Sequence, residues 1–427
     1  MKRHLLAVGL LFSASLSLCA AEFRAGVAKV DITPKDSQWL MGYAARQSTG
    51  VHDPIFHRVV AMDDGSTQFF LISTDVCVFS PTVYDDFLRE LKQTMGIDPV
   101  NVWWTTTHTH SAPEVGPPEM YDILLKGRSD HEWSRDYLAL VKSRLMEGIR
   151  EARAKLTPAR LGIGTGMAMA NINRRAKDDA GKVSLGLNPD GPVDRQVGLI
   201  RLERVSDGSV IALIANYAMH GTVLGGRWMQ VSGDGPGVVA DYVEKKLGAP
   251  MLYINGAAGN IAPIYSVYDT PGAGHLTQFR VLLGDRILET NRHIATSPGP
   301  VSLKSSEVNI LTARKAGLTW NPALAAYAAE GAGGEPQVRI PVRFLRINDV
   351  LLWAAPVELF CEIAIHIRNQ SPFRHTFYAG YTNGWIGYLP TSEAFREGGY
   401  EPTTSPFTER AEADFVRGVL LHAQGMK

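Results

Sequence analysis

Short apolar runs that alternate with longer amphipathic segments constrain the fold of this chain more than any other feature. Six runs have the length and composition of strands buried on both faces: Phe69–Ser73, Val102–Thr106, Ile211–Ala215, Met251–Ile254, Val350–Ala354 and Phe377–Gly380. Apolar residues recur at helical spacing in Val83–Met95, Asp136–Leu156, Gly237–Leu247 and Thr277–Ile294. The alternation predicts an α/β fold with a large central mixed β-sheet flanked by helices.

The amino terminus has the pattern of a secretory signal. Lys2 precedes an apolar run from Leu5 to Leu18, and the small residues Ala20 and Ala21 follow it. We therefore expect residues 1–21 to be a cleaved signal peptide and the product to be secreted or periplasmic. No later stretch approaches the roughly 20 apolar residues of a membrane-spanning helix.

Composition limits the classes of partner that the protein can bind and the number of domains that we expect. Lys and Arg total 43, as do Asp and Glu, so the net charge is zero, and we expect no nucleic acid partner and no polybasic membrane patch. No repeat or low-complexity linker divides residues 22–427, which predicts one catalytic domain.

Cys77 and Cys361 have apolar neighbours and are expected to be buried free thiols. Lipidation at Cys19 is the minor alternative to a simple signal, because Leu18 stands where a lipobox has a small residue.

Polar residues with catalytic or metal-binding capacity follow the predicted strands. They are Asp75, His108 with His110, His220, Asn260, Glu358, and Asn383 with Tyr388. Loops beyond strand ends can vary while the sheet stays rigid, so the sites of α/β proteins gather there. We therefore expect an active site on loops at one edge of the sheet.

Two histidine motifs are the strongest local signal for a metal site. His108 and His110 stand two residues apart after a strand, and in an extended chain such residues project to the same side. His220 follows another strand and supplies a separate imidazole. A catalytic zinc ion uses about three protein ligands and keeps one position open for water. The alternatives are a pair of surface histidines and, for His220, a strand-end histidine held by hydrogen bonds.

Glu358 is the candidate carboxylate ligand, because it follows a strand and has apolar neighbours, among which an unpaired charge is costly. The alternative is a helix-start glutamate favoured by the helix dipole. Tyr388 and Tyr400 stand in glycine-rich segments, where they could donate hydroxyls to an oxyanion or could simply pack. The loop of residues 256–263 offers backbone donors but lacks the Lys and Ser/Thr of a phosphate-binding loop.

Taken in order, these motifs resemble the neutral/alkaline non-lysosomal ceramidase family, and the resemblance covers nearly all of residues 22–427. The segments that carry it are Thr107–Pro113, Asn171–Arg175, Asn216–Thr222, Ser232–Asp234, Gly256–Pro263, Pro356–Glu358, Asn383–Tyr388 and Gly398–Glu401. The resemblance implies a zinc-dependent amidase that cleaves the N-acyl bond of a small molecule, either ceramide or a related N-acyl lipid.

The resemblance also implies site residues. The family's ligands to one zinc ion fall on His108, His220, Glu358 and Tyr388, and its other active-site positions fall on His110, Arg174 and Tyr400. In the resulting hypothesis the metal supplies a water molecule of lowered pKa. Tyr400, with Arg174 nearby, stabilises the oxyanion, and His110 passes a proton to the leaving amine.

The sequence departs from the family in three places. The family's G-D-V-S-P loop has a serine where this chain has Ala262, and an aspartate where it has Asn260. The chain stops at Lys427, so we expect no immunoglobulin-like domain after the catalytic domain. These departures keep two alternatives open: a metal-dependent hydrolase of a different soluble amide or ester, and a ceramidase-like binding protein without catalysis.

Overall fold

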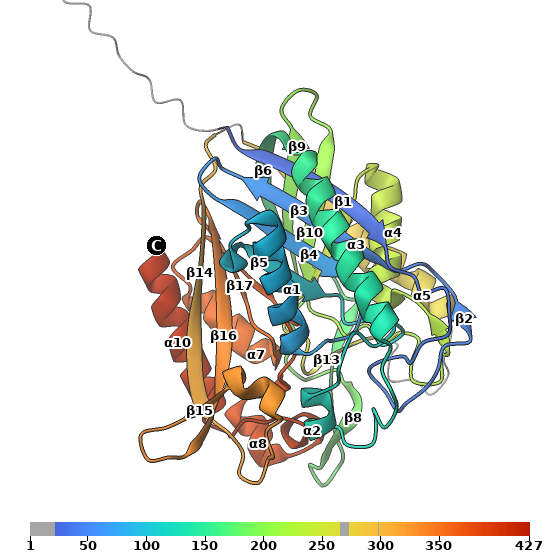
Figure 1. Cartoon of the computed structure of the whole chain (residues 1–427), viewed down its shortest axis with the longest axis vertical. Helices are drawn as coiled ribbons and strands as arrows, with labels where there is room; N and C mark the ends of the chain where they lie inside the picture. The colour runs from blue at the N-terminus through green and yellow to red at the C-terminus, as the bar shows by residue number, and fades with distance from the viewer. Residues whose placement is uncertain (1–21, 265–272, 298) are drawn as a thin grey trace, which may run out of the picture.

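Two stacked β-sheets with helices on their outer faces form the described part of the molecule (Figure 1). The computed structural model describes residues 22–264, 273–297 and 299–427. The predicted signal peptide and Cys19 lie outside these ranges. No helix within them is long and apolar enough to cross a membrane.

The larger sheet has eight strands within the described residues. In spatial order they are β12 (Met251–Asn255), β10 (Val210–Tyr217), β9 (Gln196–Arg204), β6 (Thr157–Met167), β1 (Arg24–Asp31), β3 (Phe56–Asp63), β4 (Gln68–Thr74) and β5 (Val102–Thr106). The pairs at the two edges, β12 with β10 and β4 with β5, are parallel, whereas the inner pairs are antiparallel. The predicted large mixed sheet is therefore confirmed.

Both faces of this sheet are covered, which explains the continuous apolar runs. On β4, Phe69 and Leu71 face the second sheet, while Phe70 and Ile72 face the helices, and all four are fully buried. Helices α1 (Pro81–Met95) and α3 (Arg135–Ala154) pack on one half. The other half is covered by α4 (Asp234–Leu247) and by the predicted helix near Thr277–Ile294, which comprises α5 (Ala273–Phe279), the π-helical η2 (Arg280–Asp285) and α6 (Arg286–Arg292).

The second sheet contains the last two predicted strands. It consists of β14 (Leu303–Ala313), β16 (Pro336–Ile347), β17 (Val350–Ala354) and β19 (His375–Ala379), with β15 (Ala328–Glu330) paired to β16. One face packs against the larger sheet through Leu345, Leu352 and Phe377. The other face is covered by α7 (Cys361–Gln370) and α10 (Ala411–Met426). The sequence therefore predicted strands β17 and β19 correctly, but they belong to a second layer.

Short elements at the strand ends complete the structure. They are β7 (Asn171–Lys177), β8 (Val183–Asn188) and β13 (Ile261–Pro263) in one small sheet; β18 (Glu358–Leu359) with β20 (Tyr388–Leu389); β2 (Gly50–Val51) with β11 (Gln230–Val231); and the helices α2 (Met120–Leu124), α8 (Ser392–Glu397), α9 (Tyr400–Thr403), η1 (Pro99–Asn101) and η3 (Pro322–Tyr327).

Sheet twist brings together the loops that follow β5 and β12. Counted through the pairings, these edge strands run in opposite directions. Twist of roughly 20–25° per strand accumulates over the sheet and turns one edge strand toward the direction of the other. Ser73 Oγ donates to the Tyr253 carbonyl at 2.6 Å, and Asn255 Nδ2 donates to the Thr107 carbonyl at 3.1 Å. The carboxyl ends of β5 and β12 therefore meet.

His57, on β3, is a fully buried polar residue under helix α3. Its Nδ1 lies 2.7 Å from Thr74 Oγ1 and its Nε2 lies 3.0 Å from the Val141 carbonyl. Burial lowers the pKa of this imidazole from 6.5 to about 4, against a small opposing effect of the bond to Val141. The ring is therefore neutral in the folded protein at neutral pH.

This pKa predicts an acid-sensitive step in stability. As the pH falls below 6.5, the unfolded chain takes up the proton before the folded one, so the free energy of unfolding should fall by up to about 3 kcal/mol by pH 4. Urea unfolding of the wild type and of His57→Gln at pH 7, 5.5 and 4 measures this effect. The variant should lose less stability than the wild type over this range, and parallel curves would show that His57 does not contribute.

Candidate active site

His108 and His110 lie on the loop that follows β5, where the edges of the larger sheet meet. His108 has a left-handed backbone (φ 62°), and Thr109 forms a parallel bridge with Gly221. The extended geometry predicted for this motif is therefore wrong, because the strand ends at Thr106. The two rings still meet, with His108 Nε2 and His110 Nε2 3.1 Å apart.

His220 and Glu358 join His108 in one buried cluster. Glu358 Oε2 lies 3.2 Å from His220 Nε2 and 3.4 Å from His108 Nε2. One ligand atom from each of the three residues lies within 4.8 Å of the others, and all three side chains are buried. The structure thus gathers two imidazoles and a carboxylate from three distant segments into a candidate metal-binding group.

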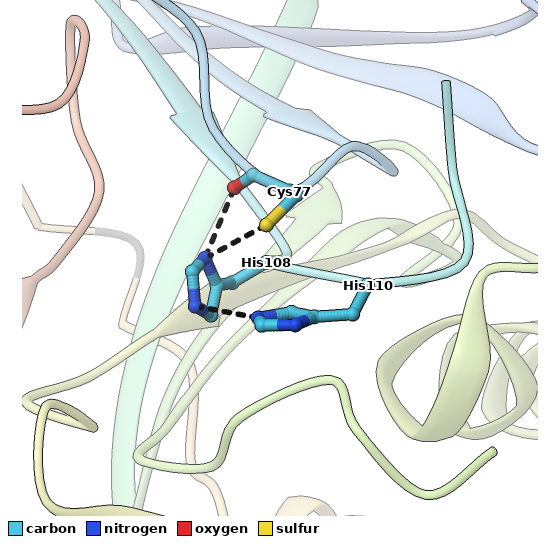
Figure 2. A group of neighbouring side chains, drawn as sticks. All are labelled: Cys77, His108 and His110. Atoms are coloured by element: carbon cyan, nitrogen blue, oxygen red, sulfur yellow. Dashed lines mark hydrogen bonds between the residues drawn. The ribbon is translucent and has the colours of Figure 1, made fainter. Parts of the chain in front are cut away.

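Backbone carbonyls orient both imidazoles. His108 Nδ1 lies 3.1 Å from the Cys77 carbonyl (Figure 2), and His220 Nδ1 lies 2.7 Å from the Ala258 carbonyl. A nitrogen that faces a carbonyl carries the proton, so the Nε2 lone pairs point toward Glu358. The thiol of Cys77 adjoins the same ring at 3.7 Å, and burial raises the pKa of this thiol well above its usual value. Both Cys77 and Cys361 are buried free thiols, as predicted.

Arg174 and Tyr388 extend the cluster. Arg174, on β7, places Nη1 3.0 Å from His220 Nε2 and donates from Nη2 to the Tyr388 hydroxyl at 3.1 Å. Strands β18 and β20 pair in parallel, which sets Tyr388 directly opposite Glu358. This short ladder explains how residues thirty positions apart in sequence come to one site.

Tyr400 lies at the partly exposed side of the cluster. Its ring centroid is 5.7 Å from that of Tyr388 and 5.9 Å from the guanidinium carbon of Arg174. Tyr400 is half-buried, whereas Tyr388 is fully buried. A continuous chain of contacts therefore connects all seven residues that the sequence predicted for the site.

Comparison with known proteins identifies the family. Residues 23–262, more than half of the chain, match the family described as neutral/alkaline non-lysosomal ceramidase, N-terminal. The chain belongs to this family. Membership of the ceramidase family places it among hydrolases of amide bonds, as the motifs predicted.

Individual ceramidases are distant from this family member in sequence. The neutral ceramidase of Pseudomonas aeruginosa is 23% identical over 91% of this chain and 70% of its own length. That of Mycobacterium tuberculosis is 26% identical over 49% of this chain and 33% of its own length. The crystal structure of the Pseudomonas enzyme has a TM-score of 0.76 at 20% identity, covering 95% of this chain and 74% of that one. A ceramidase complexed with C2 has a TM-score of 0.77 at 18% identity, covering 95% and 75%. These structures share its mixed α/β fold.

The electrostatics of this ceramidase-family site favour neutral imidazoles at His110 and His220 beside an ionised carboxylate at Glu358. Burial, then the charge of Arg174, lowers the pKa of His220 to about 3. Burial, then His108 and His220, lowers the pKa of His110 well below its usual value. Burial alone raises the pKa of Glu358, but the two histidines next to it bring that pKa well below the usual value. Such a donor set suits a divalent cation.

Sequence reasoning assigned no role to two residues that hold Glu358. Trp385 Nε1 donates to Glu358 Oε1 at 2.8 Å, and the Tyr381 hydroxyl lies 3.4 Å from Oε2. The Tyr381 ring also stacks on His108, with ring centroids 4.0 Å apart. Trp385 stands inside the glycine-rich motif, so the sequence did show an indole donor close to a predicted ligand. Nothing in the sequence marked Tyr381 as part of the site.

The segment of residues 42–46, before β2, was also missed, and it holds His110. Arg46 Nη2 donates to the His110 carbonyl, and the Tyr43 ring meets the imidazole edge-on with centroids 4.9 Å apart. Gly42 has φ 107°, and a Cβ there would lie 2.4 Å from His110 Nδ1. Only glycine fits this position. Neither a histidine nor an acid marks the segment in the sequence.

The glycine-rich loop before β13 supports the histidine of the second motif. The Ala258 carbonyl of this loop and the Ile261 carbonyl at the start of β13 accept from His220 Nδ1, and the Asn260 carbonyl of the loop accepts from the Arg174 backbone amide at 3.0 Å. The Asn260 amide group donates to Glu362 at 2.7 Å, which an aspartate could not do. Ala262 is buried opposite Ile172 of β7.

Proposed function

We propose that this protein is a zinc-dependent amidohydrolase that cleaves the N-acyl bond of ceramide or of a related N-acyl compound. The convergence of His108, His220 and Glu358 in one buried group carries the proposal. Membership in the ceramidase family supports the reaction type.

The residues present fit one zinc ion. His108, His220, Glu358 and Tyr388 would hold it, since the first three already aim donor atoms at a common point and Tyr388 stands opposite Glu358. The carbonyls at His108 Nδ1 and His220 Nδ1 fix the tautomers that such ligation requires. When bound, zinc supplies a water molecule of lowered pKa and an electrophile for the amide carbonyl.

The other side chains would bind the amide and move its proton. The His110 ring packs against Tyr43, and Arg46 holds the backbone carbonyl of the same residue. This imidazole is neutral and lies at the edge of the group, where its Nε2 can relay a proton from water to the leaving amine. Tyr400 is partly exposed and can donate its hydroxyl to the amide oxygen as charge develops there. Arg174 holds the Tyr388 phenol from within the site.

A soluble amide other than ceramide remains the second candidate substrate. Its support is Ala262, which stands in β13 where the family has a serine, pairs with β7 and so removes one hydroxyl from the region of the site. The proposed catalytic groups are unaffected by this change.

Chelation tests the proposal. Purified protein should release fatty acid from labelled ceramide or from a panel of N-acyl amines, lose this activity after treatment with a chelator, and recover it on addition of zinc. Metal analysis should find about one zinc per chain. Hydrolysis that survives complete metal removal would overturn the proposed zinc dependence, and release from other amides without release from ceramide would favour the second candidate.

We also propose that the enzyme acts outside the cytoplasm, on the support of the predicted signal segment of residues 1–21. Fractionation of expressing cells and amino-terminal sequencing of the product test this. A product that begins at Glu22 in the periplasm or medium is expected, and an uncleaved cytoplasmic product would contradict it.

A further inference from the structure

Arg128 is a charged residue beside the proposed catalytic tyrosine that has no assigned role. It lies on the loop after α2 and is half-buried. Its Nη1 is 3.4 Å from the Tyr400 hydroxyl, and its guanidinium carbon is 5.8 Å from the centroid of that ring. Arg128 and Tyr400 are both partly exposed, so a molecule that reaches Tyr400 also reaches Arg128.

The guanidinium of Arg128 has no carboxylate partner among the described residues. The nearby acids are engaged elsewhere: Asp122 accepts from the Ser129 hydroxyl, and Glu114 pairs with His131 at 2.8 Å. Arg174, by contrast, pairs with Glu401 at 2.9 Å. A half-buried cation without a counter-charge has lost part of its hydration without an ionic partner in return.

A buried phenol lies next to Arg128. The Tyr121 hydroxyl is buried, and its polar neighbour is the Arg128 guanidinium. Burial raises the pKa of this phenol, and Arg128 is close enough to lower it in part. The Tyr121 ring also contacts Trp385, which holds Glu358. A guanidinium and a buried phenol thus stand beside the proposed oxyanion residue. A half-buried guanidinium that contacts phenols but no carboxylate in the described part of the chain points to an anionic ligand that accepts its hydrogen bonds.

We infer that Arg128 binds an anionic group on the amine part of the substrate, so that the enzyme prefers N-acyl amino acids to neutral N-acyl amines. The inference rests on the proposed amidase function. Arg128 lies one hydrogen-bond length beyond the Tyr400 hydroxyl, which we assign to the amide oxygen. In the amine part of an N-acyl compound, the carbon bonded to the amide nitrogen is the atom nearest to the amide oxygen that can carry a carboxylate. A carboxylate there reaches a donor just beyond Tyr400.

The chemistry is ordinary hydrolysis of an amide. One water molecule is consumed, the carbon–nitrogen bond breaks, the hydroxyl joins the acyl carbon, and a proton joins the amine. The products are a fatty acid and an amino acid. Arg128 exchanges no atom and acts on specificity, because its charge-assisted hydrogen bond forms only with an anionic substrate.

Two substrates with the same acyl chain test the inference. N-octanoylglycine and N-octanoylethanolamine differ in a carboxylate against a hydroxymethyl group. Zinc-loaded wild type should have the higher kcat/KM for the glycine compound. Arg128→Met should lower that value about 10- to 100-fold, with little change for the ethanolamine compound. Arg128→Lys, which keeps the charge, should fall between. Lys126→Met removes an exposed cation from the same loop and should change neither substrate.

The ethanolamine activity also shows that each variant is folded and metal-loaded. An equal loss for both substrates in Arg128→Met would overturn the inference, because Arg128 would then act only through Tyr400. A wild type that prefers the neutral amide, or that cleaves ceramide but not N-octanoylglycine, would overturn it while leaving the amidase proposal intact. Failure to hydrolyse any amide would overturn the proposed function itself.

Discussion

Replacing His108 with alanine is expected to abolish both zinc binding and amide hydrolysis. The change removes one of the two imidazoles that face Glu358 and leaves the buried carboxylate with His220, Tyr381 and Trp385 as neighbours. A site that loses one of about three protein donors binds the ion far more weakly. Zinc content by elemental analysis and fatty acid release by the purified variant measure the two effects.

A control must separate loss of a ligand from loss of any histidine. His366 lies exposed on α7, away from the cluster, so His366→Ala should keep full zinc and full activity. If His108→Ala retained both, the metal assignment would be wrong. If it retained zinc but lost turnover, His108 would be a proton-transfer residue and His110 would be the better candidate for the ligand, since their Nε2 atoms are only 3.1 Å apart.

Strands buried on both faces were predictable because they leave a continuous apolar signature. The run around Phe69–Ser73 is such a strand, covered by helices on one side and by the second sheet on the other. The strands β14 and β16 have no such run. On β16, Val338, Ile340, Val342 and Phe344 point into the core while the residues between them are partly or fully exposed. Their signature is the period-two alternation of a half-covered strand. The prediction relied on continuous apolar runs, so it missed these two strands and the second layer.

The residues of the site also differ in how well the sequence predicts them. Histidines and acids that follow strands could be predicted, because their residue types and positions are visible in the sequence. Trp385, Tyr381 and Arg46 support those residues through contacts set by the pairing of distant segments. His108 shows the limit most clearly, since its predicted orientation assumed an extended chain and the left-handed backbone replaced it. The rings meet because Gly221 lets the two histidine loops approach, with the site of its missing Cβ only 2.6 Å from the His108 carbonyl oxygen.

Glu401 is the buried carboxylate on which two of the site's cations depend. It accepts from Arg174 Nε at 2.9 Å and from Arg175 Nη1 at 2.7 Å, and it is fully buried. The sequence placed it in a motif but gave it no role. Because Arg175 also pairs with Glu397, Glu401 can serve as the counter-charge of Arg174, which allows that guanidinium to stand next to His220 without an uncompensated charge in the core.

Replacing Glu401 with glutamine should therefore lower the free energy of unfolding by about 3–5 kcal/mol, because it leaves the buried Arg174 guanidinium without its carboxylate partner and Arg175 with Glu397 alone. Glu397→Gln is the matched control: that glutamate pairs with Arg175 and Lys177 near the surface, so its loss should be about 0–1 kcal/mol. Urea unfolding of the two variants measures the difference. Equal losses would mean that water or another group compensates Arg174, and its place beside His220 would then need a different explanation.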